Sequence, residues 1–252
     1  MSDFSNKTIW LTGASSGIGL SVLKKLLEAN AKVVVTGRNL KDLEALQEKY
    51  PGRIQFLYCD LSDQASIADL KGELHSRFES LDYVILNAGI CEYVDVDAMD
   101  IALYNRVMQV NFLAAVECSM IALPLLKKAQ QKSQLIFVSS LVTMLPFTRS
   151  QAYGASKAAL NYYADSLRVD LKGEVDVSVV QPGFVDTPLT QKNDFPMPFL
   201  INADEAADNI LSVLRSRKAS VAFPKRFYYV LKLLSISPAF WNFLSGKFLV
   251  RT

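Results

Sequence analysis

The sequence predicts a single α/β domain with a doubly wound, seven-stranded parallel sheet and a helical extension at the C-terminus. Short β-branched runs alternate with longer helical patterns, and several of these runs are apolar at every position. Such strands are buried on both faces, which requires a parallel sheet covered by helices on each side. The chain has 252 residues, of which 50% are hydrophobic and 21% charged, so it can bury one sizeable core.

The expected elements follow one another as strand–helix units. Strands are expected over residues 8–12, 32–37, 54–58, 83–88, 134–140, 177–183 and 221–223. Helices are expected to begin near Ile18, Leu40, Gln64, Ala98, Ala152 and Asp204. Asn39 and Ser62 are of the types that cap helix N-termini, and they precede the second and third helices. With right-handed crossovers, these units form one domain over residues 1–252.

Cysteine and histidine usage argues against several kinds of site. The three cysteines, Cys59, Cys91 and Cys118, are widely spaced, and His75 is the single histidine. This pattern fits neither a disulfide scaffold nor a Cys/His metal site, so we expect no metal and a reducing compartment. A histidine-activated nucleophile would need His75, which we expect on the surface of an amphipathic helix.

Charge and hydropathy predict location and partners. The N-terminal residues lack the pattern of a signal peptide, so a cytoplasmic protein is expected. The most hydrophobic stretch, 227–250, is broken by charged and polar residues and does not resemble a membrane span. Residues 209–252 contain eight Lys/Arg and no Asp/Glu, whereas residues 1–208 contain 19 basic and 25 acidic residues. The basic residues are dispersed and accompany no groove-reading motif, which argues against a nucleic-acid partner.

A glycine-rich turn follows the first strand. The sequence TGASSGIG occupies residues 12–19 between that strand and a helix, which is the order that a dinucleotide site requires. Gly13 can take a tight turn, Gly17 lets the backbone approach a pyrophosphate, and Gly19 allows close packing of helix on strand. The helix N-terminus adds free N–H groups and a positive dipole end. The spacing is GxxxGxG rather than GxGxxG, and an ordinary glycine-rich connection is the alternative.

Arg38 predicts which cofactor binds. It follows the second strand about 20 residues beyond the glycine turn, where an acidic residue would bind the ribose 2′-OH of NAD and an arginine would accept a 2′-phosphate. No acidic residue occupies positions 33–39. Because a guanidinium pairs with a phosphate dianion and stacks on adenine, NADP(H) is expected rather than NAD(H). A solvated arginine at a strand end is the alternative.

Tyr153 and Lys157 form the candidate proton-transfer pair. They are four residues apart in a helical pattern and therefore lie on one face of adjacent turns. A nearby ammonium and a cationic nicotinamide both favour the phenolate and lower the pKa of the tyrosine. Ser140 closes the fifth strand, at the carboxyl edge where open α/β sheets bind ligands, and can hold a substrate oxygen beside Tyr153. A surface Tyr/Lys pair is the alternative.

These motifs together resemble one family. In chain order they are TGASSGIG at 12–19, Asp60-Leu61, Asn87-Ala88-Gly89, Asn111, Ser140, Tyr153-Gly154-Ala155-Ser156-Lys157 and Pro182-Gly183. Over roughly residues 7–190 the chain resembles the short-chain dehydrogenase/reductase family, which implies a Rossmann-like fold. The implied catalytic residues are Asn111, Ser140, Tyr153 and Lys157. The implied cofactor-binding residues are Gly13, Ser15, Ser16, Gly17, Ile18, Gly19, Arg38, Asp60, Leu61, Asn87, Ala88, Gly89, Tyr153, Lys157, Pro182, Gly183, Val185 and Thr187.

The resemblance also implies how the cofactor is held. Asp60 and Leu61 would flank the adenine, and the turn 87–89 would abut the cofactor and steady the sheet. Thr187 would hold the nicotinamide carboxamide, and Lys157 would also bind the nicotinamide ribose hydroxyls.

The implied chemistry is hydride transfer between nicotinamide C4 and a substrate carbon, with Tyr153 protonating the carbonyl oxygen during reduction. Ser140 would orient the carbonyl. Ser139 is its rival, but similar proteins have the thirteen-residue gap that separates Ser140 from Tyr153. Asn111 would kink its helix and anchor a proton-relay water. Ser16 departs from the family pattern, since relatives that use NADPH often carry a basic residue there, and NADPH preference therefore depends on Arg38.

Residues 188–203 are expected to form a lid over the substrate. Apolar residues occur there and after Ser140: Phe195, Met197, Phe199, Leu200, Leu141, Val142, Met144 and Phe147. They suggest an apolar carbonyl compound rather than a charged metabolite or sugar. The alternative is that they pack the lid against the body of the domain.

The extension, residues 225–252, is predicted to form two short helices divided at Ser237-Pro238. One interpretation is that it packs on a partner subunit, or over the substrate pocket, in a homo-oligomeric dimer or tetramer. The other is a peripheral membrane contact, which aromatic and basic residues favour. Those residues are Lys225, Arg226, Lys232, Lys247 and Arg251, beside Phe240, Trp241, Phe243 and Phe248.

The sequence as a whole predicts an NADPH-dependent oxidoreductase that interconverts a hydrophobic ketone or aldehyde with its alcohol. Two alternatives remain, a non-catalytic NADP(H)-binding sensor and an NAD-linked alcohol dehydrogenase. The substrate, direction, hydride stereochemistry and subunit number stay open.

Overall fold

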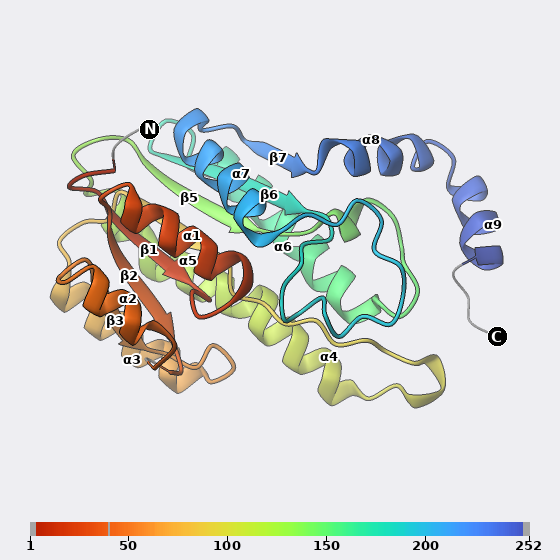
Figure 1. Ribbon diagram of the computed structural model, residues 1–252, viewed down its shortest axis with the longest axis horizontal. Coiled ribbons are helices and arrows are strands. Elements are labelled where there is room, and N and C mark those ends of the chain that lie inside the picture. The colour runs from red at the N-terminus through yellow and green to blue at the C-terminus, as the bar shows by residue number, and fades with distance from the viewer. Residues whose placement is uncertain (1–3, 40, 249–252) are drawn as a thin grey trace.

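The computed structural model describes residues 4–39 and 41–248, shown in Figure 1. All its strands belong to one parallel sheet with the order β3-β2-β1-β4-β5-β6-β7. The strands are β1 (Thr8–Thr12), β2 (Lys32–Gly37), β3 (Ile54–Tyr58), β4 (Tyr83–Leu86), β5 (Ser133–Val138), β6 (Val175–Pro182) and β7 (Ser220–Phe223). This confirms the predicted fold class.

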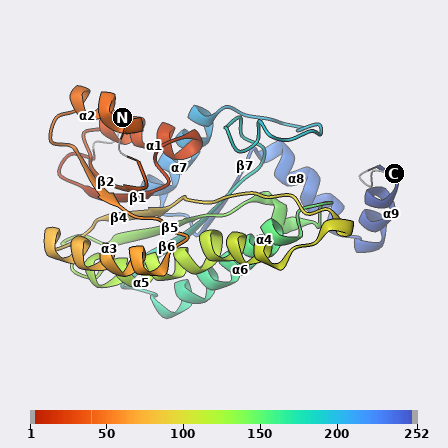
Figure 2. The same cartoon turned by 90° about the horizontal axis from the view of Figure 1, so that it is seen from below.

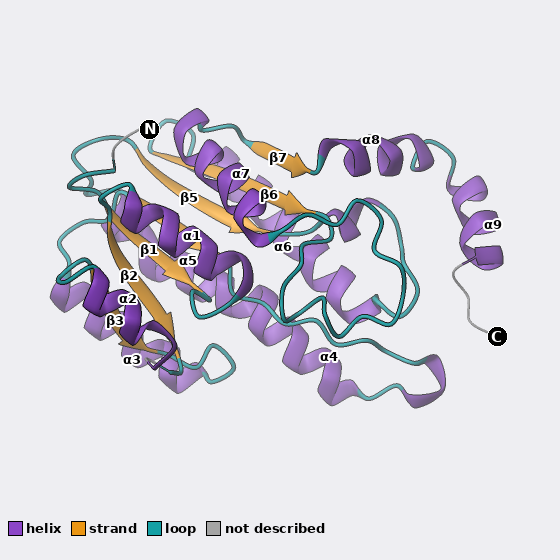
Figure 3. Ribbon diagram, viewed as in Figure 1, coloured by secondary structure: helices purple, strands orange, loops and turns teal. Residues whose placement is uncertain are grey.

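Helices cover both faces of the sheet, as the unalternated strands require. They are α1 (Gly17–Glu28), α2 (Glu44–Lys49), α3 (Gln64–Arg77), α4 (Ile101–Met108), α5 (Ala114–Leu126), α6 (Gln151–Asp170), α7 (Ala203–Ser216), α8 (Lys225–Leu234) and α9 (Pro238–Phe248). Figure 2 shows α1, α2 and α7 on one face and α3 to α6 on the other. In Figure 3, α8 and α9 project beyond the sheet, and a long loop lies between β6 and α7.

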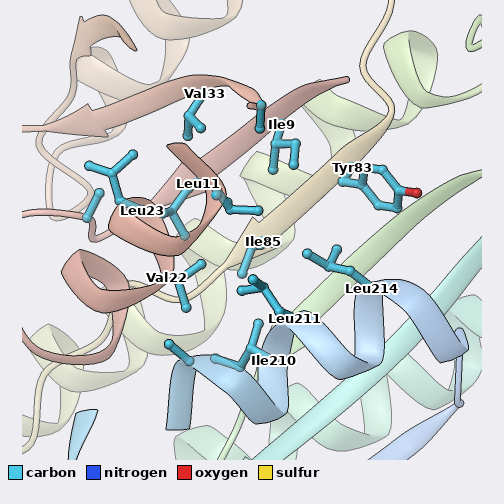
Figure 4. Packing of buried hydrophobic residues seen from close by; sticks show 14 of the residues in the cluster. Ile9, Leu11, Val22, Leu23, Val33, Tyr83, Ile85, Ile210, Leu211 and Leu214 are labelled. Atoms are coloured by element: carbon cyan, nitrogen blue, oxygen red, sulfur yellow. The ribbon is translucent and has the colours of Figure 1, made fainter. Parts of the chain in front are cut away.

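Two apolar clusters hold the layers together. Under α1 and α7, Ile9, Leu11 and Ile85 of the central strands pack against Leu23 and Leu211 (Figure 4). The second cluster lies under α3, α5 and α6 and is centred on Trp10, Val84 and Phe137. Both faces of the central strands are therefore buried, as their uninterrupted apolar sequence predicts.

Several predicted boundaries differ from the structure because polar groups end elements early. β4 ends at Leu86, since the backbone N–H groups of Asn87 and Ala88 donate to Thr12 Oγ1 instead of continuing the ladder. The cap of α3 is Asp63 rather than Ser62, because the Asp63 carboxylate accepts from two backbone N–H groups of the first turn. The segment expected to begin near Ala98 is a 3₁₀ turn there, and α4 begins at Ile101.

The structure also tests the predictions for His75, the cysteines and the helix expected to begin near Leu40. His75 is exposed, as expected, and the three cysteines are free thiols. The expected helix start at Leu40 falls on a residue outside the described ones, and a 3₁₀ turn over Lys41–Leu43 leads into α2. Arg251 also lies outside the described residues, as do the side chains of Lys247 and Phe248.

One helical stretch, Ile101–Leu126, is long and apolar enough to cross a membrane by length and composition alone. It packs with one side against β4, β5 and α6 and is 44% buried. That position is typical of a core helix of an α/β fold.

Candidate active site

A cavity of about 530 Å³ opens along the carboxyl edge of the sheet. All of the cofactor-binding residues expected from the sequence line it, and Ser140 does as well. Asn111 is buried behind the cavity wall. The structure therefore brings together, from seven separate segments, the cavity-lining residues that the sequence singled out.

The backbone geometry of the glycine turn, residues 12–19, requires glycine at several positions. Gly13 and Gly17 have φ values of +68° and +51°, in the left-handed region that favours glycine. A Cβ on Gly19 would lie 2.0 Å from the Gly13 carbonyl oxygen and 2.6 Å from Asn87 Nδ2. Gly19 therefore permits the close approach of α1 to the turn, as the sequence predicts.

Asn87 fixes this turn to the neighbouring strand. Its Nδ2 donates to the carbonyl oxygens of Thr12 and Gly13, at 3.2 and 3.0 Å. Thr12 Oγ1 accepts from the backbone N–H groups of Asn87 and Ala88 in return. These bonds cross from β1 to β4 at the floor of the cavity, and they steady the sheet as expected for the turn 87–89.

The start of α1 fits an anionic group. Ser16 precedes the helix with extended backbone, and its side chain does not cap the first turn. That turn also carries no acidic residue. Since residues 15–19 line the cavity, the uncapped N–H groups and the positive end of the helix dipole face it. A pyrophosphate matches this donor set.

Arg38 is exposed at the end of β2 and lines the same cavity. Asp60, after β3, accepts from the backbone N–H and hydroxyl of Ser62, at 2.9 and 2.7 Å. These hydrogen bonds lower the pKa of Asp60, and the Arg38 charge lowers it further. Among the residues that the structure describes, no carboxylate lies within ion-pair distance of Arg38, so its guanidinium is available to a phosphate.

Ser140, rather than Ser139, faces the tyrosine. Ser139 is buried and its hydroxyl points toward the backbone of α6, 3.4 Å from the Lys157 carbonyl oxygen. Ser140 is partly exposed to the cavity, and its hydrogen bond lowers the pKa of Tyr153. The orientation of the two hydroxyls agrees with the choice of Ser140.

Burial nevertheless raises the pKa of Tyr153 above its ordinary value, and this effect outweighs the hydrogen bond from Ser140. The sequence argument expects the opposite, a pKa lowered by Lys157 and by a bound nicotinamide. For the protein side chains alone that expectation is wrong, because Lys157 Nζ lies 5.9 Å from the ring centroid and donates to the Val138 carbonyl oxygen at 3.0 Å. Burial therefore favours the neutral form of the Tyr153 phenol.

Lys157 is a buried cation. Its side chain is 4% exposed, and burial lowers its pKa from 10.5 to about 8. The nearby Cys91 opposes this effect. A buried ammonium lowers the stability of the fold, so its presence here points to a functional role.

Replacing Lys157 with Met should therefore stabilise the protein below pH 8. The ammonium cost is fully present below the folded pKa of about 8 and disappears as pH rises toward the ordinary value of 10.5. We expect the variant to gain about 2 kcal/mol at pH 7 and almost nothing near pH 10.5, after allowance for the lost hydrogen bond.

Urea unfolding of both proteins at several pH values measures this difference. Lys172→Met, an exposed lysine just after α6, is the control and should show no such pH dependence. A Lys157→Met protein that is less stable than the parent at pH 7 would show that the ammonium stabilises the fold.

Asn111 interrupts its helix. It lies in a π-helical segment, Gln109–Leu113, between α4 and α5. Its Nδ2 donates to the Ile90 carbonyl oxygen at 2.8 Å and to Ser156 Oγ at 3.0 Å, and its Oδ1 accepts from the Ile90 N–H at 2.8 Å. Asn111 thus ties the segment after β4 to α6. Its link to a proton-relay water stays a prediction.

A polar junction behind Ser140 was not predicted. Thr143 Oγ1 donates to the Ser140 carbonyl oxygen at 3.0 Å and accepts from Asn161 Nδ2 at 3.0 Å and Gln181 Nε2 at 3.4 Å. It therefore joins the segment after β5 to α6 and to the end of β6. Asn161 lies one turn beyond Lys157, a helical spacing that could have pointed to it.

Sequence reasoning missed several cavity residues: Thr36, Gly37, Cys59, Ser62, Ile90, Arg106, Val110, Val138, Pro188, Leu189 and Thr190. Val110 precedes Asn111, and Thr190 follows Thr187 closely, so their positions offered a weak signal. The sequence contained no signal for Arg106. Its side chain lines the cavity because α4 lies beside the cavity in the folded protein. It pairs with Glu92 at 2.8 Å.

The segment expected as a lid, residues 188–203, is mostly loop and is fastened at two places. A parallel bridge between Val185 and Ile201 closes its base. At its tip, the Tyr93 hydroxyl donates to Asn193 Oδ1 at 2.5 Å. The lid therefore rests on the segment that follows β4, beside the Ser140–Tyr153 end of the cavity.

The apolar residues of the lid chiefly pack against the protein. Phe195 contacts the rings of Tyr93 and Phe184, and Phe199 stacks on Phe227 at 5.7 Å. Leu141, Met144 and Phe147 belong to a cluster with Phe227, Leu231 and Trp241. Of the two interpretations of these side chains, the structure favours packing of the lid against the body.

The fold and the cavity together define the class of protein. A doubly wound parallel sheet with a glycine turn, an open helix N-terminus and a Ser/Tyr/Lys group at one carboxyl-edge cavity is a Rossmann-like nucleotide-binding oxidoreductase architecture. The model of the family described as short chain dehydrogenase matches residues 7–196. The chain belongs to this family, an oxidoreductase family, as the resemblance implied.

Individual relatives span much of the chain. The benzil reductase ((S)-benzoin forming) of Saccharomyces cerevisiae is 35% identical over 193 residues, 73% of each chain. The fatty acyl-CoA reductase of Acinetobacter baylyi is 30% identical over 86% of this chain and 75% of its own. A short-chain dehydrogenase from Sphingobium yanoikuyae, solved in complex with NADPH, superposes with a TM-score of 0.79 over 96% of this chain and 93% of its own. At 21% identity, that structure supports the fold alone.

Proposed function

We propose that this oxidoreductase uses NADP(H) to interconvert a hydrophobic ketone or aldehyde with its alcohol. One observation carries the proposal. Ser140, Tyr153 and Lys157 line the same cavity as the glycine turn and Arg38, and Ser140 after β5 lies three strands away from Arg38 after β2 in the sheet order. A reacting centre and a dinucleotide-binding edge therefore share one space.

The residues at the dinucleotide edge fit NADP(H). The open N-terminus of α1 would hold the pyrophosphate, Arg38 the 2′-phosphate, and Thr187 the carboxamide end. When bound, the nicotinamide supplies or accepts the hydride. The Sphingobium relative was solved with NADPH, which agrees with this choice.

Side chains of this protein would supply and accept the proton in the reaction. Tyr153 holds its proton at Oη, because burial keeps the phenol neutral, and can donate it to a carbonyl oxygen. Ser140 Oγ, on the same side, orients that oxygen. The Lys157 ammonium, which donates to the Val138 carbonyl oxygen at the cavity wall, would bind the nicotinamide ribose hydroxyls.

The substrate class is inferred from relatives and from the cavity wall. Benzil and fatty acyl groups, in the names of two relatives, are largely apolar. Ile90, Val110, Val138 and Leu189 line the cavity here. An apolar carbonyl compound matches both, and a panel of ketones and aldehydes with NADPH tests the proposal by the loss of NADPH absorbance.

Arg38→Ala should separate the two cofactors. We expect NADPH binding to weaken about 10- to 100-fold, because a charge-assisted bond to the 2′-phosphate is lost, while NADH binding changes little. Quenching of tryptophan fluorescence measures both affinities. Arg77→Ala, an exposed arginine on α3, is the control. Equal weakening of both cofactors would show that Arg38 does not read the 2′-phosphate.

A homo-oligomer, dimer or tetramer, remains part of the proposal. Leu113 of the π-helical segment, Met120 of α5 and Tyr162 of α6 are exposed on helices that cover the same face of the sheet. These side chains offer an apolar surface to a second subunit. A cytoplasmic location also stays a prediction.

A further inference from the structure

The extension, α8 with α9, is amphipathic, and its inner side is firmly attached. Phe227, Leu231 and Trp241 are buried in one cluster with Leu141 and Leu145. The Trp241 indole N–H donates to the Pro146 carbonyl oxygen at 2.9 Å. These contacts hold the extension against the segment that follows Ser140, so its other side has a defined direction in space.

The extension also exposes large apolar residues on α8, in the turn after it and on α9. Tyr229, Leu233, Ile236, Phe240 and Phe243 follow one another at intervals of four, three, four and three residues. Each is 50 to 76% exposed. Single exposed apolar residues are common, but a run of five along one projecting extension marks an interaction surface. We name these five residues the outer stripe.

The charge around the outer stripe has one sign. Lys225, Arg226 and Lys232 are exposed beside it, and residues 209–252 contain no Asp or Glu. Two copies of this surface brought face to face would oppose cation to cation, which disfavours a symmetric contact. A surface of anionic phospholipid attracts all three cations and accepts the apolar side chains among its acyl chains. Charge complementarity therefore favours lipid.

The lid contacts the inner side of the extension. Phe199 and Leu200 of the lid are 43% and 44% exposed, and the Phe199 ring stacks on the buried Phe227 of α8. Leu189, ten residues earlier in the lid, lines the cavity. Exposed apolar side chains thus occur on the extension and on the loop that borders the candidate active site.

We propose that the outer stripe, its three cations and the exposed lid residues dock on the surface of an anionic phospholipid bilayer. The protein lies on the bilayer without crossing it. Docking places the lid at the lipid surface, so that a carbonyl compound dissolved in the bilayer reaches the cavity without passing through water. This delivery rests on the proposed function, whereas the docking does not.

Vesicle flotation of the full chain, without cofactor or substrate, tests the docking. The probes are phosphatidylcholine vesicles with and without phosphatidylglycerol, at low and moderate salt. We expect binding to the anionic vesicles, at least about tenfold weaker binding to the neutral ones, and weakening by salt. No binding to anionic vesicles at low salt would overturn the proposal.

Paired variants identify the surface. Leu233→Glu with Phe243→Glu, and Lys225→Glu with Arg226→Glu, should each weaken binding about tenfold or more. Val169→Glu, an equally exposed apolar residue on α6, should leave binding unchanged. All five substituted residues are exposed, so folding is expected to survive and is checked by circular dichroism.

Two other results of these experiments would assign the outer stripe differently. Vesicle binding that survives both paired variants would show that another surface is responsible and would overturn the assignment. Loss of an oligomer in light scattering of the Leu233/Phe243 variant, with no vesicle binding by the parent protein, would make the outer stripe an interface between copies. Failure of the carbonyl panel, by contrast, would affect the proposed reaction and leave the vesicle result standing.

Discussion

Tyr153→Phe is expected to lower carbonyl reduction by about 10²- to 10⁴-fold, the usual contribution of a positioned proton donor. The change removes one oxygen atom from a ring that borders the cavity and leaves the ring in place. Because Arg38 and Asp60 follow β2 and β3, at the far side of the sheet order from Ser140 after β5, NADPH affinity should stay within about threefold. Loss of NADPH absorbance measures turnover, and tryptophan fluorescence measures binding.

Tyr162→Phe is the matched control. It lies on the same helix, α6, but its side chain is 81% exposed and outside the cavity. We expect it to keep full turnover. A Tyr153→Phe protein that keeps its turnover would remove Tyr153 from the proton-transfer role, and a parent protein that binds NADPH tightly but turns over no carbonyl would support the sensor interpretation.

Gly19→Ala is expected to have the other large effect. Its Cβ would lie 2.0 Å from the Gly13 carbonyl oxygen and 2.6 Å from Asn87 Nδ2, so backbone must move. Overlap of this kind destabilises proteins by roughly 1–3 kcal/mol or more, and here it also displaces the uncapped N–H groups that face the cavity. We expect lower stability and loss of most NADPH affinity together.

Gly72→Ala is the matched control for this change. Gly72 lies inside helix α3, and a Cβ there meets nothing within 4 Å. The substitution should stabilise the protein by roughly 0.5–1 kcal/mol, since alanine is the better helix former. Urea unfolding and cofactor titration of both variants test the pair. Normal NADPH binding by Gly19→Ala would mean that the turn tolerates a shift and that its close packing is dispensable.

Much of the fold could be predicted from the sequence, because the apolar positions in its local pattern are also the positions that are buried. Strands such as 83–86 are apolar throughout, so they had to lie inside a covered parallel sheet. Boundaries were less predictable. Asp63 rather than Ser62 caps α3 because Ser62 is engaged by Asp60, a contact that residue type alone does not reveal. Likewise, the family resemblance implied a kink at Asn111, but the residues around it did not predict a π-helical segment, which is held by partners in the segment after β4 and in α6.

The sequence by itself determined which residues meet at the carboxyl edge. Glycine positions, the four-residue spacing of Tyr153 and Lys157, and the strand ends are local properties that a parallel sheet brings to one side. Only the tertiary structure decided how these groups behave. Which serine faces the tyrosine, and the direction in which the pKa values of Tyr153 and Lys157 move, depend on desolvation and on partners such as Val138. Those neighbours are distant in the chain, so their effect on the site exists only once the sheet has formed.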